Sequence, residues 1–124
     1  MVDPISIGFG SNRWLKDSDT QFLSLFRATN GTGWYSLHSY LNVDYLVPVG
    51  KKFIILGNGF KTATMSIGYD TVADNSGTTV YSGMEPSTSA SHMWAEIPAS
   101  NYISVYVNAT ANAEGSLWGI ETTT

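Results

Sequence analysis

The sequence contains no cysteine, which excludes disulfide bonds and thiolate metal sites. Charge is scarce as well, because Asp, Glu, Lys and Arg make up 13% of the 124 residues, about half the usual share of a globular protein. The formal net charge is −4, and Lys51-Lys52 is the single basic pair. Since phosphate contacts need clustered Lys or Arg, we expect no nucleic-acid partner.

Long apolar runs are also missing. No stretch approaches the roughly 20 apolar residues that cross a bilayer, so we expect no contact with a membrane. Residues 1–7 contain neither a basic region nor a continuous apolar region, and no signal peptide is visible. We therefore expect a complete product that is made in the cytoplasm.

Catalytic motifs are absent too. The two histidines, His38 and His92, have no His-x-x-x-His partner, and the sequence contains no Gly-x-Ser-x-Gly elbow or glycine-rich phosphate loop. We interpret both histidines as structural or surface residues. We expect no catalytic residue, no metal and no cofactor. A small hydrolase on a jelly-roll or cupin-like scaffold would need a cluster of ligands or catalytic side chains, and the sequence shows no local motif for one.

What the sequence does contain is typical of an all-β protein. Hydrophobic residues make up 43% and aromatic residues 13%, which is enough to bury, and the polar positions are mostly neutral. About eight short β-prone segments and no clear helix predict an antiparallel β-sandwich with jelly-roll or Greek-key topology, or else a partly closed barrel. We interpret residues 1–33 as an irregular N-terminal arm with a first strand, and residues 34–124 as the sandwich domain. Residues 21–27 fit either a helical turn or a buried strand.

The strongest local signal is Asn58-Gly59, which stands between the apolar run Phe53-Ile54-Ile55-Leu56 and the alternating residues 63–69. Both central residues of a type I′ turn need positive φ, and Asn-Gly supplies them readily. The sequence therefore predicts a β-hairpin that turns at Asn58-Gly59.

Three further patterns refine this prediction. Asp74-Asn75-Ser76-Gly77 predicts a turn. Residues 84–91 are interpreted as a loop. In the strand that begins at Tyr102, we expect Ile103, Val105 and Val107 to face the core.

Two segments of the sequence resemble each other, and each contains a proline ahead of a strand. Val47-Pro48-Val49-Gly50 precedes one strand, and Ile97-Pro98-Ala99-Ser100 precedes another. Proline favours the entry of a strand because it lacks a backbone donor. We expect equivalent turns in the two halves of the sandwich.

Two groups of residues are candidates for ligand binding. Asp70, Asp74 and Asn75 form the best local group of oxygen ligands for Ca²⁺, although side chains of this kind also build hairpin turns, which is the simpler interpretation. The tryptophans could stack on sugar rings, but core packing and protein contacts are the simpler interpretation. These tryptophans are Trp14, Trp34, Trp94 and Trp118.

The chain resembles small β-sandwich accessory proteins of tailed bacteriophages in two segments, Val47-Pro48-Val49-Gly50-Lys51-Lys52-Phe53-Ile54-Ile55-Leu56 and Ile97-Pro98-Ala99-Ser100-Asn101-Tyr102-Ile103-Ser104-Val105-Tyr106-Val107. These are capsid decoration (cement) proteins and fibre heads. The resemblance covers roughly residues 45–120 and transfers no catalytic residue. It implies a virion location and a structural role.

The sequence, with this resemblance, therefore predicts a non-enzymatic virion structural protein, a capsid decoration or cement protein that stabilises contacts between capsid subunits. Expected partners are the major capsid protein or other virion proteins and further copies of the chain, in a dimer or trimer. Apolar residues of the first 30 positions are the expected contacts. They are Ile5, Ile7, Phe9, Trp14, Phe22 and Phe26. The alternative is a receptor- or carbohydrate-binding module, which predicts an exposed Trp or Tyr platform with polar neighbours.

Overall fold

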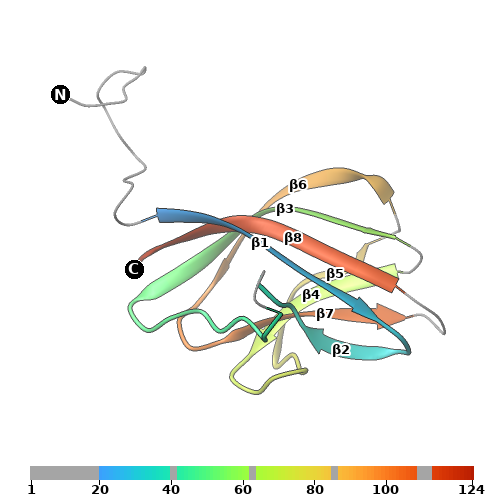
Figure 1. Ribbon diagram of the computed structural model, residues 1–124, viewed down its shortest axis with the longest axis horizontal. Helices are drawn as coiled ribbons and strands as arrows, with labels where there is room; N and C mark the ends of the chain where they lie inside the picture. The colour runs from blue at the N-terminus through green and yellow to red at the C-terminus, as the bar shows by residue number, and fades with distance from the viewer. Residues whose placement is uncertain (1–19, 40–41, 62–63, 85–86, 109–112) are drawn as a thin grey trace.

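The computed structural model describes residues 20–39, 42–61, 64–84, 87–108 and 113–124 (Figure 1). This part of the chain forms strands and connecting loops, without a helix, and so offers no helix that could span a membrane. Its strands are β1 (Thr20–Thr29), β2 (Gly33–Ser36), β3 (Lys51–Lys61), β4 (Thr64–Asp70), β5 (Thr78–Met84), β6 (Ser87–Ile97), β7 (Tyr102–Asn108) and β8 (Ala113–Thr123).

The strands form two antiparallel sheets that pack face to face, in the orders β1-β8-β3-β6 and β2-β7-β4-β5 (Figure 1). The chain changes sheet at almost every connection, and β4 and β5 are the consecutive strands that pair as a hairpin. The pairs β1 with β8, β2 with β7, β3 with β6 and β4 with β5 are nested one inside the next. This is the topology of a jelly roll, and it confirms the predicted fold class.

The core lies between the inner faces of the two sheets, and alternation along each strand selects its residues. In β7 the prediction is confirmed, because Ile103, Val105 and Val107 are buried. The other strands and loops contribute the remaining core side chains. They are Leu25, Leu37, Val47, Phe53, Ile55, Met65, Ile67, Ile97, Ala113 and Leu117.

The predicted hairpin at Asn58-Gly59 is wrong. β3 continues through both residues to Lys61, and the following strand, β4, belongs to the opposite sheet. Asn58 pairs with Leu117 on one side and Ser91 on the other. Its side chain is buried, and its Nδ2 donates to Sδ of Met93 at 3.2 Å. Tertiary pairing on both sides of the strand has overridden the local turn preference.

A β-bulge explains how Asn58 comes to point inward. The register of β3 against β8 shifts between Ile55 and Gly57, so that Leu56 is the extra residue. Such a shift moves every later side chain to the other face. Gly57 lies under the indole ring of Trp118, where an added Cβ would come within 2.1 Å of Cζ2. Glycine is required at position 57 because the Trp118 ring occupies the space that a Cβ would need.

Two other boundaries differ from the sequence prediction. Residues 87–91, expected in a loop, belong to β6, because they pair with the part of β3 that was expected to turn. Residues 21–27, which fitted either a helical turn or a strand, lie in β1 and pair with β8 throughout. The predicted arm before Thr20 lies outside the described residues.

The two proline turns are equivalent, as expected from the sequence. Each leads into a strand, β3 or β7, and each contains a residue of positive φ, Gly50 at 80° and Ser100 at 62°. The two segments also contact each other, since the Ser100 amide donates to the Val47 carbonyl at 2.7 Å and the Val47 amide donates to the Asn101 carbonyl at 3.0 Å. This pairing closes one end of the sandwich.

One acidic side chain lies among the core residues. Glu121 is 7% exposed on β8, and its Oε1 accepts a hydrogen bond from the Tyr45 hydroxyl at 2.5 Å. The Tyr45 ring packs edge-on against Phe53, with centroids 5.6 Å apart. Burial, and then the hydrogen bond to Glu121, raise the pKa of the Tyr45 hydroxyl, so Tyr45 remains a donor at neutral pH.

Candidate functional site

The loop of residues 71–77, which connects β4 and β5, folds over part of the outer face of the β2-β7-β4-β5 sheet. Ser36, Ser104 and Gly68 occupy one row across β2, β7 and β4. The Ser104 hydroxyl donates to the Asn75 carbonyl at 2.7 Å. A Cβ on Gly68 would lie 2.0 Å from the Ser76 hydroxyl. Small side chains in this row therefore leave the space that the loop fills.

Asp74 fixes the loop to β2. The Ser36 amide donates to Asp74 Oδ1 at 2.8 Å, and the Asp74 amide donates back to Ser36 Oγ at 2.7 Å. Asp74 has a φ of 57°, a conformation that Asp and Asn tolerate better than most residues. The predicted turn residues 74–77 lie in the β4–β5 loop, which turns at Ala73 and Asp74, and the Asp74 side chain holds the loop in place.

Arg27 joins this loop to the other sheet. Its Nη1 donates to the Ser36 carbonyl at 2.9 Å and contacts Asp44 Oδ1 at 3.3 Å and Asp74 Oδ1 at 3.2 Å. The guanidinium also lies 5.5 Å from the centre of the Tyr35 ring, a cation–π distance. Arg27 comes from β1, so a single side chain ties the two sheets together at this end.

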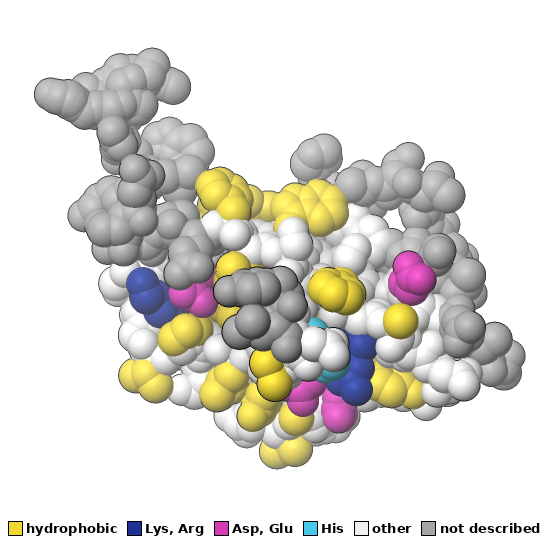
Figure 2. Space-filling model, in the orientation of Figure 1, with side chains coloured by type: hydrophobic (Ala, Val, Ile, Leu, Met, Phe, Trp, Pro, Cys, Tyr) yellow, Lys and Arg dark blue, Asp and Glu magenta, His cyan; other side chains and the backbone are white. Residues whose placement is uncertain are grey.

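His38 belongs to the same cluster. Its Nε2 lies 2.9 Å from Asp44 Oδ1, and its Nδ1 lies 3.1 Å from Asn42 Oδ1. In Figure 2, a histidine lies beside basic and acidic side chains. Among the described residues no group of three His, Asp or Glu side chains is arranged to hold a metal ion. His92 lies in β6, and its side chain is outside the described set.

The Ca²⁺ candidate of the sequence is a turn. Asp70 accepts hydrogen bonds from the side-chain amide of Asn75 and from the Thr71 amide, the latter at 2.6 Å. These bonds, with that from Asn75 the largest, hold the pKa of the Asp70 carboxyl below its ordinary value. Asp74 is directed away from Asp70, toward Ser36 and Arg27. The three side chains therefore stabilise the loop in the way that the simpler interpretation describes.

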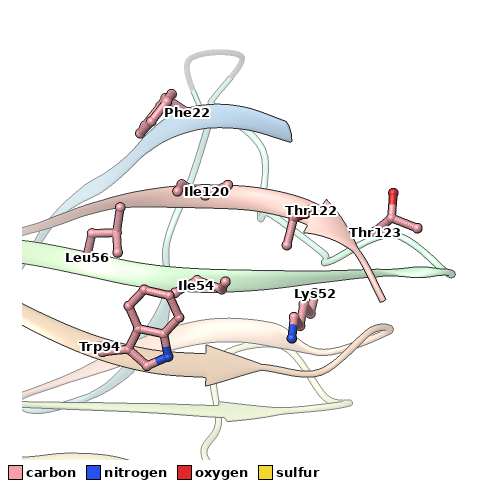
Figure 3. A pocket seen from close by; sticks show the side chains of 8 residues that line it. All are labelled: Phe22, Lys52, Ile54, Leu56, Trp94, Ile120, Thr122 and Thr123. Atoms are coloured by element: carbon pink, nitrogen blue, oxygen red, sulfur yellow. The ribbon is translucent and has the colours of Figure 1, made fainter. Parts of the chain in front are cut away.

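The outer face of the β1-β8-β3-β6 sheet is different, because it carries an apolar groove of about 580 Å³ (Figure 3). Phe22 projects from β1 on one side and Trp94 from β6 on the other, with Ile54, Leu56 and Ile120 between them (Figure 3). Figure 2 shows hydrophobic side chains projecting from this side of the molecule. The lining residues are Phe22, Lys52, Ile54, Leu56, Trp94, Ile120, Thr122 and Thr123.

Register explains why these side chains meet. Phe22 is opposite Ile120, and Ile120 is opposite Ile54, so the three lie in one row across β1, β8 and β3. Ile54 and Ile120 are 7% and 5% exposed and form the floor. Phe22 and Trp94 form the walls and remain 68% and 65% exposed. Exposed aromatic side chains beside an apolar floor are typical of an interaction surface.

The rim of the groove carries a polar triad, Lys52, Trp94 and Glu96. Lys52 Nζ lies 3.1 Å from Glu96 Oε1, and Trp94 Nε1 donates to Glu96 Oε2 at 3.1 Å. These two contacts, with that from Lys52 the larger, hold the pKa of the Glu96 carboxyl below its ordinary value. The carboxylate thereby orients the indole ring, whose apolar faces remain free for contact.

The six predicted contact residues divide into two sets. Phe22 lines the groove, and Phe26 projects from the same outer face of β1 and is 51% exposed. The other four, Ile5, Ile7, Phe9 and Trp14, lie outside the described residues.

Sequence reasoning missed the floor of the groove. The signal was present in Phe53-Ile54-Ile55-Leu56, because a strand that is apolar at successive positions is apolar on both faces. Phe53 and Ile55 enter the core, and Ile54 and Leu56 line the groove.

Comparison of the chain with family models, with curated proteins and with solved structures found no match.

Proposed function

We propose that this protein is a non-enzymatic virion structural protein, a capsid decoration or cement protein, that binds a neighbouring protein subunit through the groove on the β1-β8-β3-β6 sheet. The observation that carries the proposal is the pairing of a buried apolar floor with two exposed aromatic walls, Phe22 and Trp94. The virion setting is supported by the resemblance of the two proline-led strands to phage accessory proteins. The proposed partner is the major capsid protein or another virion protein.

The chemistry of the groove favours a protein partner. Its floor and walls are aliphatic and aromatic, and the Glu96 carboxylate at its rim already contacts Lys52 and Trp94. A partner would therefore gain affinity by burying apolar area. At protein interfaces, truncating a central aromatic anchor costs about 2 kcal/mol or more, which is about thirtyfold in Kd.

Co-sedimentation with virus particles tests the proposal. Particles are purified from cells that produce the chain, and the bound chain is quantified by mass spectrometry. We expect wild-type chain to sediment with the particles and the double variant Phe22→Ser/Trp94→Ser to remain in the supernatant.

Tyr81→Ser is the matched control. Tyr81 is an aromatic residue of β5, in the other sheet, and is 48% exposed. This variant should sediment like the wild type. Circular dichroism should show that all three proteins are folded. Equal sedimentation of the double variant and the wild type, or no sedimentation of either, would refute the proposal.

A second candidate function is carbohydrate binding, and the geometry of Trp94 favours it. Its exposed indole stands beside Glu96 and Lys52, which is an aromatic platform with polar neighbours. This function predicts that a glycan array gives hits and that Trp94→Ala abolishes them while Tyr81→Ala keeps them. An array without hits would remove this candidate.

A further inference from the structure

We propose that β6 pairs with β6 of a second copy of the chain, so that two sandwiches join edge to edge around a twofold axis. This inference goes beyond the proposed function, because it assigns another surface, the edge of a sheet, to another partner. β6 is the last strand of its sheet and pairs with β3 on one side, while no strand of the described part of the chain pairs with its other side (Figure 1). Such an edge presents backbone donors and acceptors to a further strand.

The chain itself occupies two of the other three sheet edges. At the edge of β2, the Ser36 amide donates to Asp74 Oδ1 at 2.8 Å, and the Ser36 carbonyl accepts from Arg27 Nη1 at 2.9 Å. At the edge of β1, Phe26 and His38 exchange two backbone hydrogen bonds of 2.9 and 3.1 Å. The third, β5, has two register shifts against β4 within 7 residues, and such bulges disfavour pairing with another strand. β6 is therefore the edge best suited to accept a strand.

The C-terminal part of β6, residues 93–97, lacks lysine and proline, two residues that commonly protect an edge. Its charged side chain, Glu96, is directed across the sheet to β3, where Oε1 lies 3.1 Å from Lys52 Nζ. The register against β3 is regular from Ala95 to the end of the strand and shifts before Ala95, and Pro98 follows the strand. The shift and Pro98 limit self-pairing to about these five residues.

The order of residues in this segment selects one register. Directly opposed side chains of an antiparallel pair lie on the same face, so the axis of a symmetric pair passes through a single residue. An axis at Glu96 would place two carboxylates opposite each other, and an axis at Trp94 would extend the pairing into the shifted part of β6. An axis at Ala95 places Trp94 opposite Glu96 of the second copy and pairs residues 93–97 entirely with themselves.

Trp94 is the side chain that this pairing affects most. The two Trp94 residues become diagonal neighbours on one face, at a spacing of about 7–8 Å that aromatic rings can bridge. Trp94 is 65% exposed in the single chain, so each ring has surface for the other to cover. Since a tryptophan buries at most about 250 Å², the contact is far smaller than the roughly 1,200 Å² of a stable interface. We therefore expect a weak dimer, which a lattice of attachment points would strengthen.

Sedimentation velocity on the purified full chain, from micromolar to millimolar concentration, tests the inference. We expect the wild type to become dimeric toward the upper end of this range. Trp94→Glu should stay monomeric, because it places a second negative charge opposite Glu96 of the other copy. Tyr81→Glu is the matched control and should dimerise like the wild type, since Tyr81 is an exposed aromatic residue of β5, the edge strand of the other sheet. Circular dichroism should show that all of these proteins are folded.

An exchange of charge identifies the partner and the register. A chain that carries both Trp94→Lys and Glu96→Lys has two positive charges on the segment and should also be monomeric by itself. Mixed with the Trp94→Glu chain, it should form a heterodimer. A wild type that remains monomeric at millimolar concentration, a trimer, a dimer of Trp94→Glu, a monomeric Tyr81→Glu or a mixture that does not associate would each overturn the inference.

Hydrogen exchange tests the location of the contact without any substitution. Amides of residues 93–97 should exchange several times more slowly at millimolar than at micromolar concentration, while those of β5 should exchange equally at both. Equal rates for residues 93–97 at the two concentrations would contradict the inference. Because no virus particle is used, failure here leaves the co-sedimentation test of the proposed function unaffected.

Discussion

On the outer face of the β2-β7-β4-β5 sheet the side chains below the 71–77 loop are small, Ser36, Ser104 and Gly68, and the chain covers them with its own loop. On the outer face of the β1-β8-β3-β6 sheet the side chains are large, and Phe22 and Trp94 are exposed for most of their surface. The part of one face below the loop and the groove on the other face therefore differ both in side-chain size and in what lies over them.

From this difference we infer that residues under the loop contribute to folding stability and that residues of the groove contribute to binding. On the covered face, serine hydroxyls and backbone groups are satisfied inside the molecule, so a substitution there acts on folding. On the open face, the aromatic walls are mostly exposed, so we expect a substitution there to act on what the groove binds. The predictions below test this separation, from the largest expected effect to the smallest.

The largest effect is expected at Gly68 on the covered face. A Cβ there would lie 2.0 Å from the Ser76 hydroxyl and 2.6 Å from the Thr78 carbonyl oxygen, and the backbone atom cannot rotate away. Gly68→Ala should therefore lower the free energy of unfolding in urea by about 1–3 kcal/mol.

Gly59→Ala provides the control for Gly68→Ala. Gly59 also lies in a strand, but its nearest neighbour, Ser116 Oγ, would be 3.8 Å from an added Cβ, an ordinary contact. A loss in Gly59→Ala as large as that in Gly68→Ala would show that the loop is not what makes the covered face intolerant.

Asp74→Ala should have the next largest effect. It removes the acceptor of the buried Ser36 amide and one ionic partner of Arg27, at a position with positive φ. We expect a loss of about 1–2 kcal/mol in the free energy of unfolding.

Asp74→Asn retains an acceptor and tolerates the same backbone conformation, so it should lose less than Asp74→Ala. Equal losses in the two variants would assign the effect to charge rather than to the hydrogen bond with Ser36. Urea denaturation of both proteins distinguishes the two.

The structure also shows which features of the fold can be predicted from the sequence. About eight short β-prone segments predicted the all-β sandwich, and alternation in β7 predicted its core face, because burial on one face leaves a local pattern. The prediction of a hairpin at Asn58-Gly59 was wrong because β3 pairs there with β6 and β8, which are distant in sequence. The bulge at Leu56 is part of the same pairing. No local pattern reports which distant strands flank a residue.

The candidate site divides in the same way. Phe22 and the double-sided apolar run at residues 53–56 were visible in the sequence, and they supply one wall and part of the floor of the groove. The packing of the 71–77 loop on the sheet could not be predicted from the sequence, because Ser36 and Ser104 are residues of the kind that usually face solvent. Arg27 contacts Asp44 and Asp74 only because the chain crosses between the sheets, and no local pattern reports such a contact.

On the open face, Trp94→Ser should leave folding nearly unchanged. Trp94 is 65% exposed, and substitutions at such positions usually change the free energy of unfolding by less than about 0.5 kcal/mol. The same variant should lose binding to particles or glycans. A loss of stability as large as that of Gly68→Ala would mean that the wall of the groove belongs to the core, and the separation of the two faces would fail.

The smallest effect concerns the pKa of Glu96 at the rim of the groove. Lys52, and then Trp94, lower it in the folded chain. A carboxyl whose folded pKa is below its unfolded pKa stabilises the fold above the unfolded pKa, and this contribution is lost as the pH falls through the folded pKa. Lys52→Met should raise the titration midpoint of Glu96 toward that of an ordinary glutamate, as measured from its carboxyl ¹³C shift.

The pKa of Asp70, which lies beside the loop on the other face, can be compared with the pKa of Glu96 in the same experiment. Its pKa is also lowered, but by hydrogen bonds within its own loop, from Asn75 and Thr71, and not by a lysine. Lys52→Met should therefore leave the midpoint of Asp70 unchanged, and Asn75→Ala should raise it while leaving that of Glu96 unchanged. If either substitution moved both midpoints, the two faces would be electrostatically coupled through the sandwich, and the assignment of one face to folding and the other to binding would have to include that coupling.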